Sequence, residues 1–434
     1  MLRLVYSALF TLALPLVLMR LWWRGRNEAG YRAHIGERFG RFAQVPVPGA
    51  IWVHAVSVGE VRAALPLVRA LQVRYAAAPI LLTCMTPSGR AMAATLFGAQ
   101  SDVTIAYLPY DLSWLMRRLL RHFKPRALLI METEIWFNLV HACREARLPV
   151  LLVNARLSAR SRAGYARSAP IRKLAVDALA SMSLIAAQSA DDAARFESLG
   201  AQRVVVTGNI KFDMPVDAAI AGRGAAWRAE LAGSRQVLLL AATRDGEETL
   251  LLDAFRAAFD TNARRHILLV VVPRHSQRFD EVVVQVSAAG FQAARRSALG
   301  GRLDNVDVWV GDSMGEMAAY YTLCDLAIIG GSFAPLGGQN LIEAAALGRP
   351  TIIGPHVFNF SDAVRLAAAA GALQQVSDAG CAMRAARDLL ADRATMLRMS
   401  AAALAFSEAH RGATDKTVEL VAAAIGPHQV NPVG

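Results

Sequence analysis

The chain has 434 residues, 54% of them hydrophobic, which is enough for two domains that each bury a core. Its formal net charge of +12 predicts an acidic partner: a membrane surface, a phosphorylated substrate or a nucleic acid. The four cysteines lie far apart and form no C-x-x-C pair. This spacing favours a reducing compartment and argues against a disulfide framework and a structural zinc site.

The N-terminus predicts a membrane anchor over residues 1–26. Residues 4–19 are apolar except for one serine and one threonine, and as a helix they would be about 24 Å long. Leu21-Trp22-Trp23 adds rings typical of the membrane interface, and arginines follow at 20, 24 and 26. By the positive-inside rule we expect the bulk of the chain in the cytoplasm. A cleaved signal peptide and a segment lying in the interface are the alternatives.

From residue 50 onward, apolar runs with the length of buried strands alternate with helical patterns, which predicts parallel, doubly wound α/β sheets. The expected strands of a first set are 51–56, 79–82, 127–131, 150–153, 184–187 and 204–206. Those of a second set are 237–241, 267–272, 306–310, 326–329 and 351–353. We therefore expect a first Rossmann-like domain over 27–212, a linker over 213–233 and a second Rossmann-like domain over 234–405. A C-terminal helix over 406–434 could pack back on the first domain.

Polar residues follow the strands of the first set, where parallel sheets bind ligands. They are Glu60, Thr86, Glu132 and Asn154. Glu60 closes an S-x-x-E sequence, which fits an ordinary capping box as well as a catalytic carboxylate. Glu132, with Glu134 two residues on, could form a metal pair, an acid/base pair or a cap. No histidine pair has metal-ligand spacing, so we expect no metal site.

Residues 156–173 contain five arginines and one lysine but no acid. The segment fits a solvated basic face, a phospholipid contact, or a dock for a phosphorylated, membrane-borne acceptor. Nucleic acid is disfavoured, because Tyr165 is the one stacking ring in the segment.

The second set contains a strand, a glycine-rich loop and a helix over residues 325–350. Such a loop lets backbone N–H groups approach an anion, although a plain turn capped by Asn340 and Glu343 also fits. Arg274 follows another strand and could hold a phosphate, while Glu343 could accept hydrogen bonds from ribose hydroxyls. Ser313-x-x-Glu316 marks a further helix start, suited to an anion or to a plain cap. The absence of G-x-G-x-x-G after a strand and of G-x-x-x-x-G-K-[ST] disfavours dehydrogenases and P-loop enzymes.

Many ordered sequence blocks together resemble the 3-deoxy-D-manno-octulosonic acid (Kdo) transferases of Gram-negative bacteria, over nearly the whole chain. The blocks are S-V-G-E at 57–60, L-P-Y-D at 108–111, M-E-T-E-I-W at 131–136, N-A-R-L-S at 154–158, G-N-I-K-F-D at 208–213, V-P-R-H at 272–275, G-D-S-M-G-E at 311–316, G-P-H at 354–356 and F-N-F at 358–360. Leu341 and Phe137 stand where proline is expected in many relatives, a departure without an obvious consequence.

The resemblance implies a GT-B glycosyltransferase with an interdomain cleft, CMP-Kdo as the donor and a lipid A precursor as the acceptor. The enzyme would work without a metal or cofactor at the cytoplasmic face of the inner membrane, in contact with phospholipid and not with nucleic acid. The family's general base matches Glu60, and its transition-state stabilising residues match Glu132 and Lys211. Its CMP-binding positions match Pro273, Arg274, Met314, Gly315, Glu316, Asn340, Leu341, Ile342 and Glu343. The alternatives are a different membrane-associated GT-B enzyme that uses a UDP-sugar, and a non-enzymatic basic membrane adaptor or nucleic-acid binder.

Overall fold

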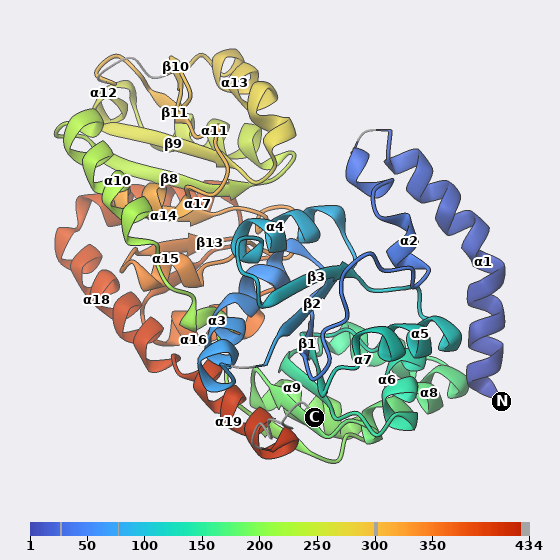
Figure 1. Ribbon diagram of the computed structural model, residues 1–434. Helices are drawn as coiled ribbons and strands as arrows, with labels where there is room; N and C mark the ends of the chain where they lie inside the picture. The colour runs from blue at the N-terminus through green and yellow to red at the C-terminus, as the bar shows by residue number, and fades with distance from the viewer. Residues whose placement is uncertain (27, 77, 299–302, 427–434) are drawn as a thin grey trace. The chain divides into compact units, whose positions relative to one another are not determined.

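The computed structural model describes residues 1–26, 28–76, 78–298 and 303–426. The chain forms two compact units. Unit 1 contains residues 1–214 and the chain from Arg411 onward, and unit 2 contains Pro215–His410. Each unit is built on a seven-stranded sheet in which all paired strands run parallel. In Figure 1 the strands of each unit are flanked by helices. This confirms the predicted pair of doubly wound α/β sheets.

The sheet of unit 1 has the order β3-β2-β1-β4-β5-β6-β7. Ile51 in β1 lies opposite Ile80 in β2 on one side and Ala127 in β4 on the other. The edge strand β3 was missed, because Thr104 interrupts its short apolar sequence, V-T-I-A-Y, which lacks the continuous run of a central strand. The strands are β1 Ile51–His54, β2 Ile80–Cys84, β3 Val103–Tyr107, β4 Ala127–Met131, β5 Val150–Ala155, β6 Leu184–Ala187 and β7 Val204–Val206.

Helices cover both faces of this sheet, because successive strand residues point to opposite sides. Ile51 and Val53 belong to a core shared with α3, α4 and α19, whereas Trp52 belongs to the core shared with α5, α6, α8 and α9. The helices of unit 1 are α1 Leu2–Arg24, η1 Ala29–Tyr31, α2 Ile35–Arg38, α3 Val58–Arg74, α4 Pro87–Phe97, α5 Ser113–Phe123, α6 Phe137–Glu145, α7 Ala159–Ala166, α8 Ala169–Ala180, α9 Ala190–Ser198, η2 Ile210–Asp213 and α19 Ala413–Ile425.

The sheet of unit 2 has the order β10-β11-β9-β8-β12-β13-β14, and a buried core lies between its strands and α11, α13 and α17. The strands β10 and β14 at its edges were missed because their sequences, A-A-R and L-Q-Q, contain no apolar run of strand type. The strands are β8 Gln236–Thr243, β9 Ile267–Pro273, β10 Ala293–Arg295, β11 Val308–Val310, β12 Leu326–Ile329, β13 Thr351–Ile353 and β14 Leu373–Gln375. The helices are α10 Ala218–Trp227, η3 Arg228–Ala232, α11 Glu247–Ala258, α12 Thr261–Arg265, η4 Ser276–Arg278, α13 Phe279–Ala288, α14 Met317–Leu323, α15 Ile342–Ala346, α16 Ser361–Ala369, α17 Ala379–Ala391 and α18 Arg393–Ala409.

Much of the segment expected as a linker, residues 213–233, is helical. Its helix α10 packs on α14 of unit 2. The Trp227 ring meets those of Trp309 and Tyr320 at centroid distances of 5.2 Å each, and Gly224 allows close approach to the Ala319 backbone. The aromatic contacts explain why a stretch rich in alanine and glycine is ordered here.

The start of the last helix of unit 1, α19, is held by one carboxylate. Asp213 accepts hydrogen bonds from Gly412 N at 2.7 Å and Thr414 N at 2.6 Å, at the start of α19. Val418 and Val421 then enter the core beside α3. An aspartate at this place satisfies backbone donors that the helix itself leaves unpaired.

We predict that Asp213→Ala will loosen α19. Leaving two backbone N–H groups without their acceptor should cost about 1–3 kcal/mol of unfolding free energy. Hydrogen exchange measured by mass spectrometry should show faster exchange in α19, and urea unfolding should show the lower stability.

The matched control is Asp217→Ala, because Asp217 also accepts two backbone hydrogen bonds, at the start of α10. That variant should leave exchange in α19 unchanged. Equal exchange of α19 in both variants and the parent would contradict the role given to Asp213.

Candidate active site

The candidate catalytic residues of unit 1 lie where the strand order of the sheet changes direction. From β1 the chain builds outward through β2 and β3, and then returns to place β4 on the other side of β1. Glu60 lies in the first turn of α3, after β1, and Glu132 follows β4 directly. Loops that diverge from two such neighbouring strands form the usual ligand site of a doubly wound sheet.

Glu60 completes a capping box. Its Oε2 accepts a hydrogen bond from Val56 N at 2.8 Å, its Oε1 accepts one from Ser57 Oγ at 2.9 Å, and Glu60 N donates to Ser57 Oγ. The structural interpretation of S-x-x-E is therefore correct, and it also fixes the carboxylate at the strand end. Burial raises the pKa of Glu60 to about 7, the nearby Glu132 carboxylate adds to the rise, and the hydrogen bond from Val56 opposes it.

Glu132 forms an ion pair with Lys211, with 2.7 Å between Oε1 and Nζ. Glu132 has a φ of 59°, a left-handed conformation that is costly for a residue with a side chain. The adjoining strand holds it there, because Glu132 N donates to Val153 O at 3.0 Å and Glu132 O accepts from Arg156 N at 3.3 Å. Such enforced conformations occur often at functional sites.

Two asparagines position the backbone of Lys211. The buried Asn154, also left-handed at a φ of 50°, accepts a hydrogen bond from Ile210 N at 3.0 Å. Asn209 accepts one from Lys211 N, also at 3.0 Å. The sequence marked Asn154 only as a polar residue after a strand, and nothing in it showed that this side chain reaches residue 210.

A third carboxylate, Glu134, lies near this pair. Burial and the charge of Glu132 both raise the pKa of Glu134. The three acids differ in setting, because Glu132 is paired with a lysine while Glu60 is bound to a hydroxyl and a backbone amide. Within the described part of the chain, no group of three or more His, Cys, Asp or Glu residues is arranged to hold a metal ion.

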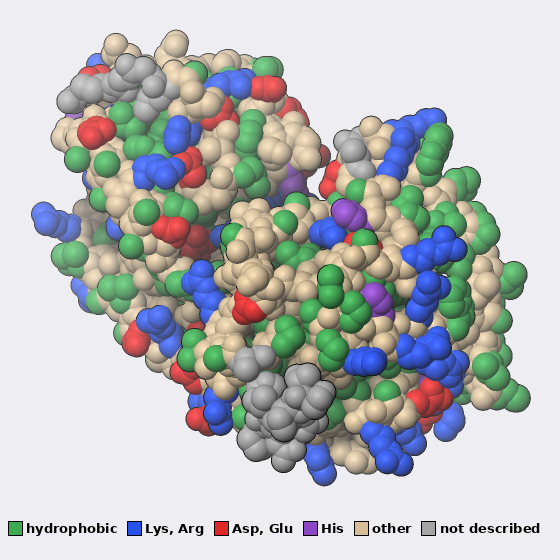
Figure 2. Space-filling model, viewed as in Figure 1, with side chains coloured by type: hydrophobic (Ala, Val, Ile, Leu, Met, Phe, Trp, Pro, Cys, Tyr) green, Lys and Arg blue, Asp and Glu red, His purple; other side chains and the backbone are tan. Residues whose placement is uncertain are grey.

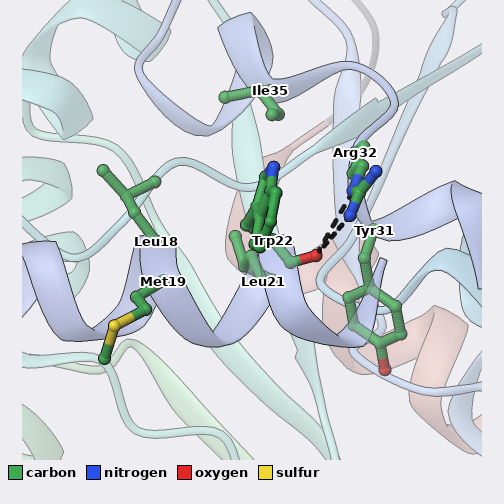
Figure 3. Close-up of a pocket in the computed structure, with 7 residues that line it drawn as sticks. All are labelled: Leu18, Met19, Leu21, Trp22, Tyr31, Arg32 and Ile35. Carbon is green, nitrogen blue, oxygen red and sulfur yellow. Dashed lines mark hydrogen bonds between the residues drawn. The ribbon is translucent and has the colours of Figure 1, made fainter. Parts of the chain in front are cut away.

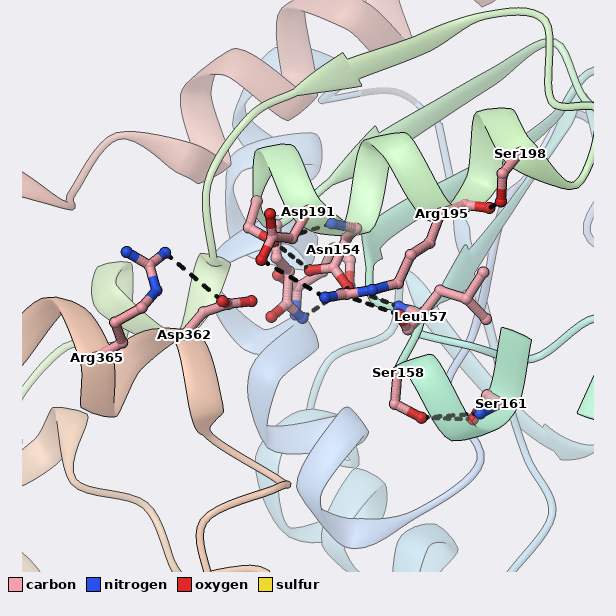
Figure 4. A network of polar contacts seen from close by, with 12 residues as sticks. Asn154, Leu157, Ser158, Ser161, Asp191, Arg195, Ser198, Asp362 and Arg365 are labelled. Carbon is pink, nitrogen blue, oxygen red and sulfur yellow. Dashed lines mark hydrogen bonds and ion pairs between the residues drawn. The ribbon is translucent and has the colours of Figure 1, made fainter. Parts of the chain in front are cut away.

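The basic segment 156–173 begins beside β5 and is presented by a local network, shown in Figure 4. Leu157 N donates to Asp192 Oδ1 at 2.8 Å, and Arg195 donates to Leu157 O at 3.3 Å. Ser158 caps α7 by accepting a hydrogen bond from Ser161 N at 3.0 Å. Beyond this network the basic side chains of α7 and α8 are exposed, namely Arg160, Arg162, Arg167, Arg172 and Lys173.

In unit 2 the candidate CMP-binding residues follow β9, β11 and β12, so they lie along the carboxyl edge of one parallel sheet. Arg274 Nε donates to Gln339 Oε1 at 3.2 Å, which connects the loop after β9 to the loop after β12. Tyr321 OH donates to Asn340 O at 3.4 Å and connects the latter loop to α14. Gln339 was missed, because an isolated glutamine in a loop has no recognisable signal.

The glycine-rich loop after β12 surrounds an anion that belongs to the chain itself. The carboxylate of Glu247 accepts hydrogen bonds from Gly331 N at 2.6 Å, Phe333 N at 2.9 Å and Arg244 N at 2.9 Å. Glu247 is buried at the switch point between β8 and β12. These N–H groups are thus already satisfied, and Glu247 was missed because it looks like an ordinary acid at a helix start.

The remaining candidates differ in how they can meet a ligand. Asn340 accepts a hydrogen bond from Ile342 N at 3.0 Å in the turn before α15, a helix of five residues. Leu341 and Ile342 are buried, so they could meet a ligand only through their backbone, and Pro273 is buried as well. Glu343 is half-buried on α15.

Glu316 is engaged by three side chains of unit 2. It accepts hydrogen bonds from Arg223, Ser313 and Arg296. Burial opposes ionisation, but these hydrogen bonds outweigh it and lower the pKa of Glu316. Next to it Met314 is exposed and Gly315 has a φ of 83°, with open space where a side chain would be. The structure thus brings Glu60, Glu132 and Lys211 together in unit 1, and the CMP-binding candidates to one sheet edge in unit 2.

Comparison with known proteins gives the family. Residues 33–214 match the model of the 3-deoxy-D-manno-octulosonic-acid transferase (kdotransferase) family. The chain is 45% identical to the 3-deoxy-D-manno-octulosonic acid transferase of Bordetella pertussis over 94% of this chain and 97% of that one. It is 34% identical to the enzyme of the same name from Haemophilus influenzae, over 96% and 98% of the two chains.

Among solved structures, UDP-GlcNAc 2-epimerase from Neisseria meningitidis bound to UDP-GlcNAc has a TM-score of 0.59, covering 86% of this chain and 99% of that one. At 14% identity this likeness shows the fold alone, and it agrees with the expected GT-B type. The family rests on the two close relatives. The chain therefore belongs to the 3-deoxy-D-manno-octulosonic acid transferase family, and it is a glycosyltransferase.

Proposed function

We propose that this enzyme transfers Kdo from CMP-Kdo to a lipid A precursor (lipid IVA), with inversion, in lipopolysaccharide core biosynthesis. The observation that carries the proposal is the Glu60 carboxylate, with a pKa of about 7, beside the Lys211–Glu132 ion pair. The family of its relatives supports Kdo as the sugar. The enzyme would act at the cytoplasmic face of the inner membrane, without a metal and without nucleic acid as a partner.

In this mechanism Glu60 is the general base. It accepts the proton of the acceptor hydroxyl while the hydroxyl oxygen attacks the anomeric carbon of Kdo. The bond between that carbon and the phosphate oxygen of CMP breaks, and CMP leaves with the electron pair. Attack from the face opposite CMP inverts the anomeric configuration.

The Lys211–Glu132 pair would stabilise the charges of the transition state. Positive charge develops at the anomeric carbon as CMP departs, and the Glu132 carboxylate can counter it. The Lys211 ammonium can counter the carboxylate that Kdo itself carries. The hydrogen bonds of Asn154 and Asn209 near Lys211 would keep this pair in place before substrate arrives.

The donor would bind at the carboxyl edge of the sheet of unit 2. Arg274 would hold the phosphate of CMP, and Glu343 would accept hydrogen bonds from the ribose hydroxyls. Leu341 and Ile342, whose side chains are buried, would contribute their backbone alone. Because the leaving group is a monophosphate, no pyrophosphate has to be chelated by a metal.

The direct test is mass spectrometry of the lipid A precursor after incubation with the enzyme and CMP-Kdo. A mass increase of one or more Kdo residues is expected, and CMP but not UDP should inhibit the reaction. No mass increase with CMP-Kdo, combined with transfer from a UDP-sugar, would favour the alternative GT-B activity.

We predict that Glu60→Gln will lower kcat about 10²- to 10⁴-fold, because the amide cannot accept the proton. CMP binding, measured by calorimetry, should be unchanged, since the CMP candidates lie in unit 2.

The matched variant is Ser57→Ala, which removes the other half of the capping box. It should cost about 1 kcal/mol of stability but retain most of the activity. Equal activity losses in the two variants would mean that Glu60 acts only as a cap.

The pH profile should report the ionisation of Glu60. The base is active when deprotonated, so kcat/KM should fall as the pH drops through about 7 and level off above it. In Ser57→Ala the inflection should move to higher pH, because the hydrogen bond from Ser57 helps to lower the pKa of Glu60. If the inflection stays at the same pH in Ser57→Ala, a group other than Glu60 causes it.

We predict that Arg274→Ala will weaken CMP binding about 10- to 100-fold, the effect of losing a charge-assisted hydrogen bond. The control is Arg256→Ala on α11, where the exposed arginine pairs with Asp253 one turn away. Calorimetric titration with CMP should distinguish the two variants. Equal CMP affinities of the two variants would mean that Arg274 does not bind CMP.

A further inference from the structure

Helix α1 lies against unit 1 along most of its length. Phe10, Leu14, Val17 and Leu21, spaced three or four residues apart, pack against a cluster formed by Tyr110, Leu112 and Leu115. The helix also contacts α6 and α8. The contacts run from the first turns of α1 to its last, so this is a docked helix with one protein-facing side.

The protein-facing side also carries polar contacts. Tyr6 OH donates to Asp111 Oδ2 at 3.1 Å, and Asn138 Nδ2 donates to Ser7 Oγ at 3.0 Å. Asp111 is buried, and it accepts two more hydrogen bonds from the backbone of α6, from Asn138 N and Leu139 N. Pulling α1 away would break these two hydrogen bonds, to the Asp111 carboxylate and from the Asn138 amide, and each contributes about 0.5–3 kcal/mol.

The opposite side of α1 is apolar and open. Figure 2 shows hydrophobic side chains along the edge of the molecule where α1 runs in Figure 1. Leu12 is 76% exposed and its neighbours on this side are similar: Leu4, Leu9, Leu16, Met19 and Trp23. Both sides of α1 are therefore largely apolar, whereas a surface helix that faces water carries polar residues on its open side.

Basic residues lie on the two helices next to α1. The exposed face of α5 carries Trp114, Arg117, Arg118 and Arg121, and the same helix supplies Leu115 to the cluster that holds α1. Helix α8, which contacts α1, exposes Arg172 and Lys173. Exposed tryptophan and arginine beside an apolar helix face complement an anionic lipid surface.

An open pocket of about 380 Å³ lies at the end of α1, shown in Figure 3. Leu18, Leu21, Trp22 and Ile35 are among its lining residues, and Arg32 donates to Trp22 O at 2.9 Å. The guanidinium groups of Arg26 and Arg32 lie 4.7 and 4.9 Å from the Trp22 ring centroid. Apolar walls beside two arginines suit a phospholipid, whose acyl chain would contact the walls and whose phosphate would contact the arginines.

The length of α1 by itself would allow a span, because 23 residues rise about 34 Å. The helix is also apolar enough to cross a membrane. However, a crossing would either break the contacts of Tyr6 and Ser7 or draw α5, with its arginines, into the hydrocarbon, and both are costly.

We propose that α1 lies in the plane of the membrane, with its protein-facing side docked on unit 1 and its apolar face embedded in a layer of anionic phospholipid. The chain is then a monotopic protein whose N-terminus stays on the same side as both units. This inference concerns the membrane contact and holds independently of the proposed transfer reaction.

A cysteine inserted after the fully exposed Met1 tests the topology. Cells with a permeabilised outer membrane are treated with a membrane-impermeant maleimide before and after lysis of the inner membrane. We expect labelling only after lysis. Labelling of intact cells to the level of a periplasmic control protein would show a spanning helix and overturn the proposal.

Vesicle flotation tests the embedded face with the full chain. Leu9→Glu, on the open side, should lower binding to phosphatidylglycerol vesicles at least about tenfold and leave Tm unchanged, because this side chain has little protein contact to lose. Leu14→Ala, on the docked side, should lower Tm and retain vesicle binding. Unchanged binding of Leu9→Glu, or equal binding of the parent to phosphatidylcholine at low salt, would contradict an anionic lipid contact at this face.

Discussion

The order of the strands in unit 1 is the constraint on which the candidate active site depends. Parallel pairing places β1 beside β4, although more than seventy residues separate them, and both strands end at the same edge. Glu60 and Glu132 follow those two ends, and η2 adds Lys211 from a third place in the chain. The sheet thereby concentrates charge that no short segment of the sequence contains.

Neighbouring structure gives similar acids different roles. Glu60, Glu247 and Glu316 all stand at or near the start of a helix after a strand. Glu247 is surrounded by backbone N–H groups, whereas Glu316 accepts hydrogen bonds from two arginines and a serine. Glu60 is bound to a hydroxyl and one amide, and burial together with a neighbouring carboxylate raises its pKa to about 7.

Neighbouring structure likewise sets the orientation of α1 in the proposed membrane contact. A hydropathy pattern describes how apolar α1 is, but the direction in which its leucines point depends on what the other side binds. Asp111 and Asn138 provide that partner from within unit 1. In the proposed membrane contact, this docking holds unit 1 against the lipid.

The sequence by itself determined the doubly wound α/β class, most of the strands and, through many ordered motifs, the family. It did so because buried strands and helices have their own periodicities and because glycine, proline and capping residues act locally. The tertiary structure alone decided which acids are paired or capped, that the glycine-rich loop encloses Glu247, and which side of α1 faces the protein. These features depend on hydrogen bonds between residues tens to more than a hundred positions apart, such as Asn154 to Ile210 and Tyr6 to Asp111, and no local pattern records such partners.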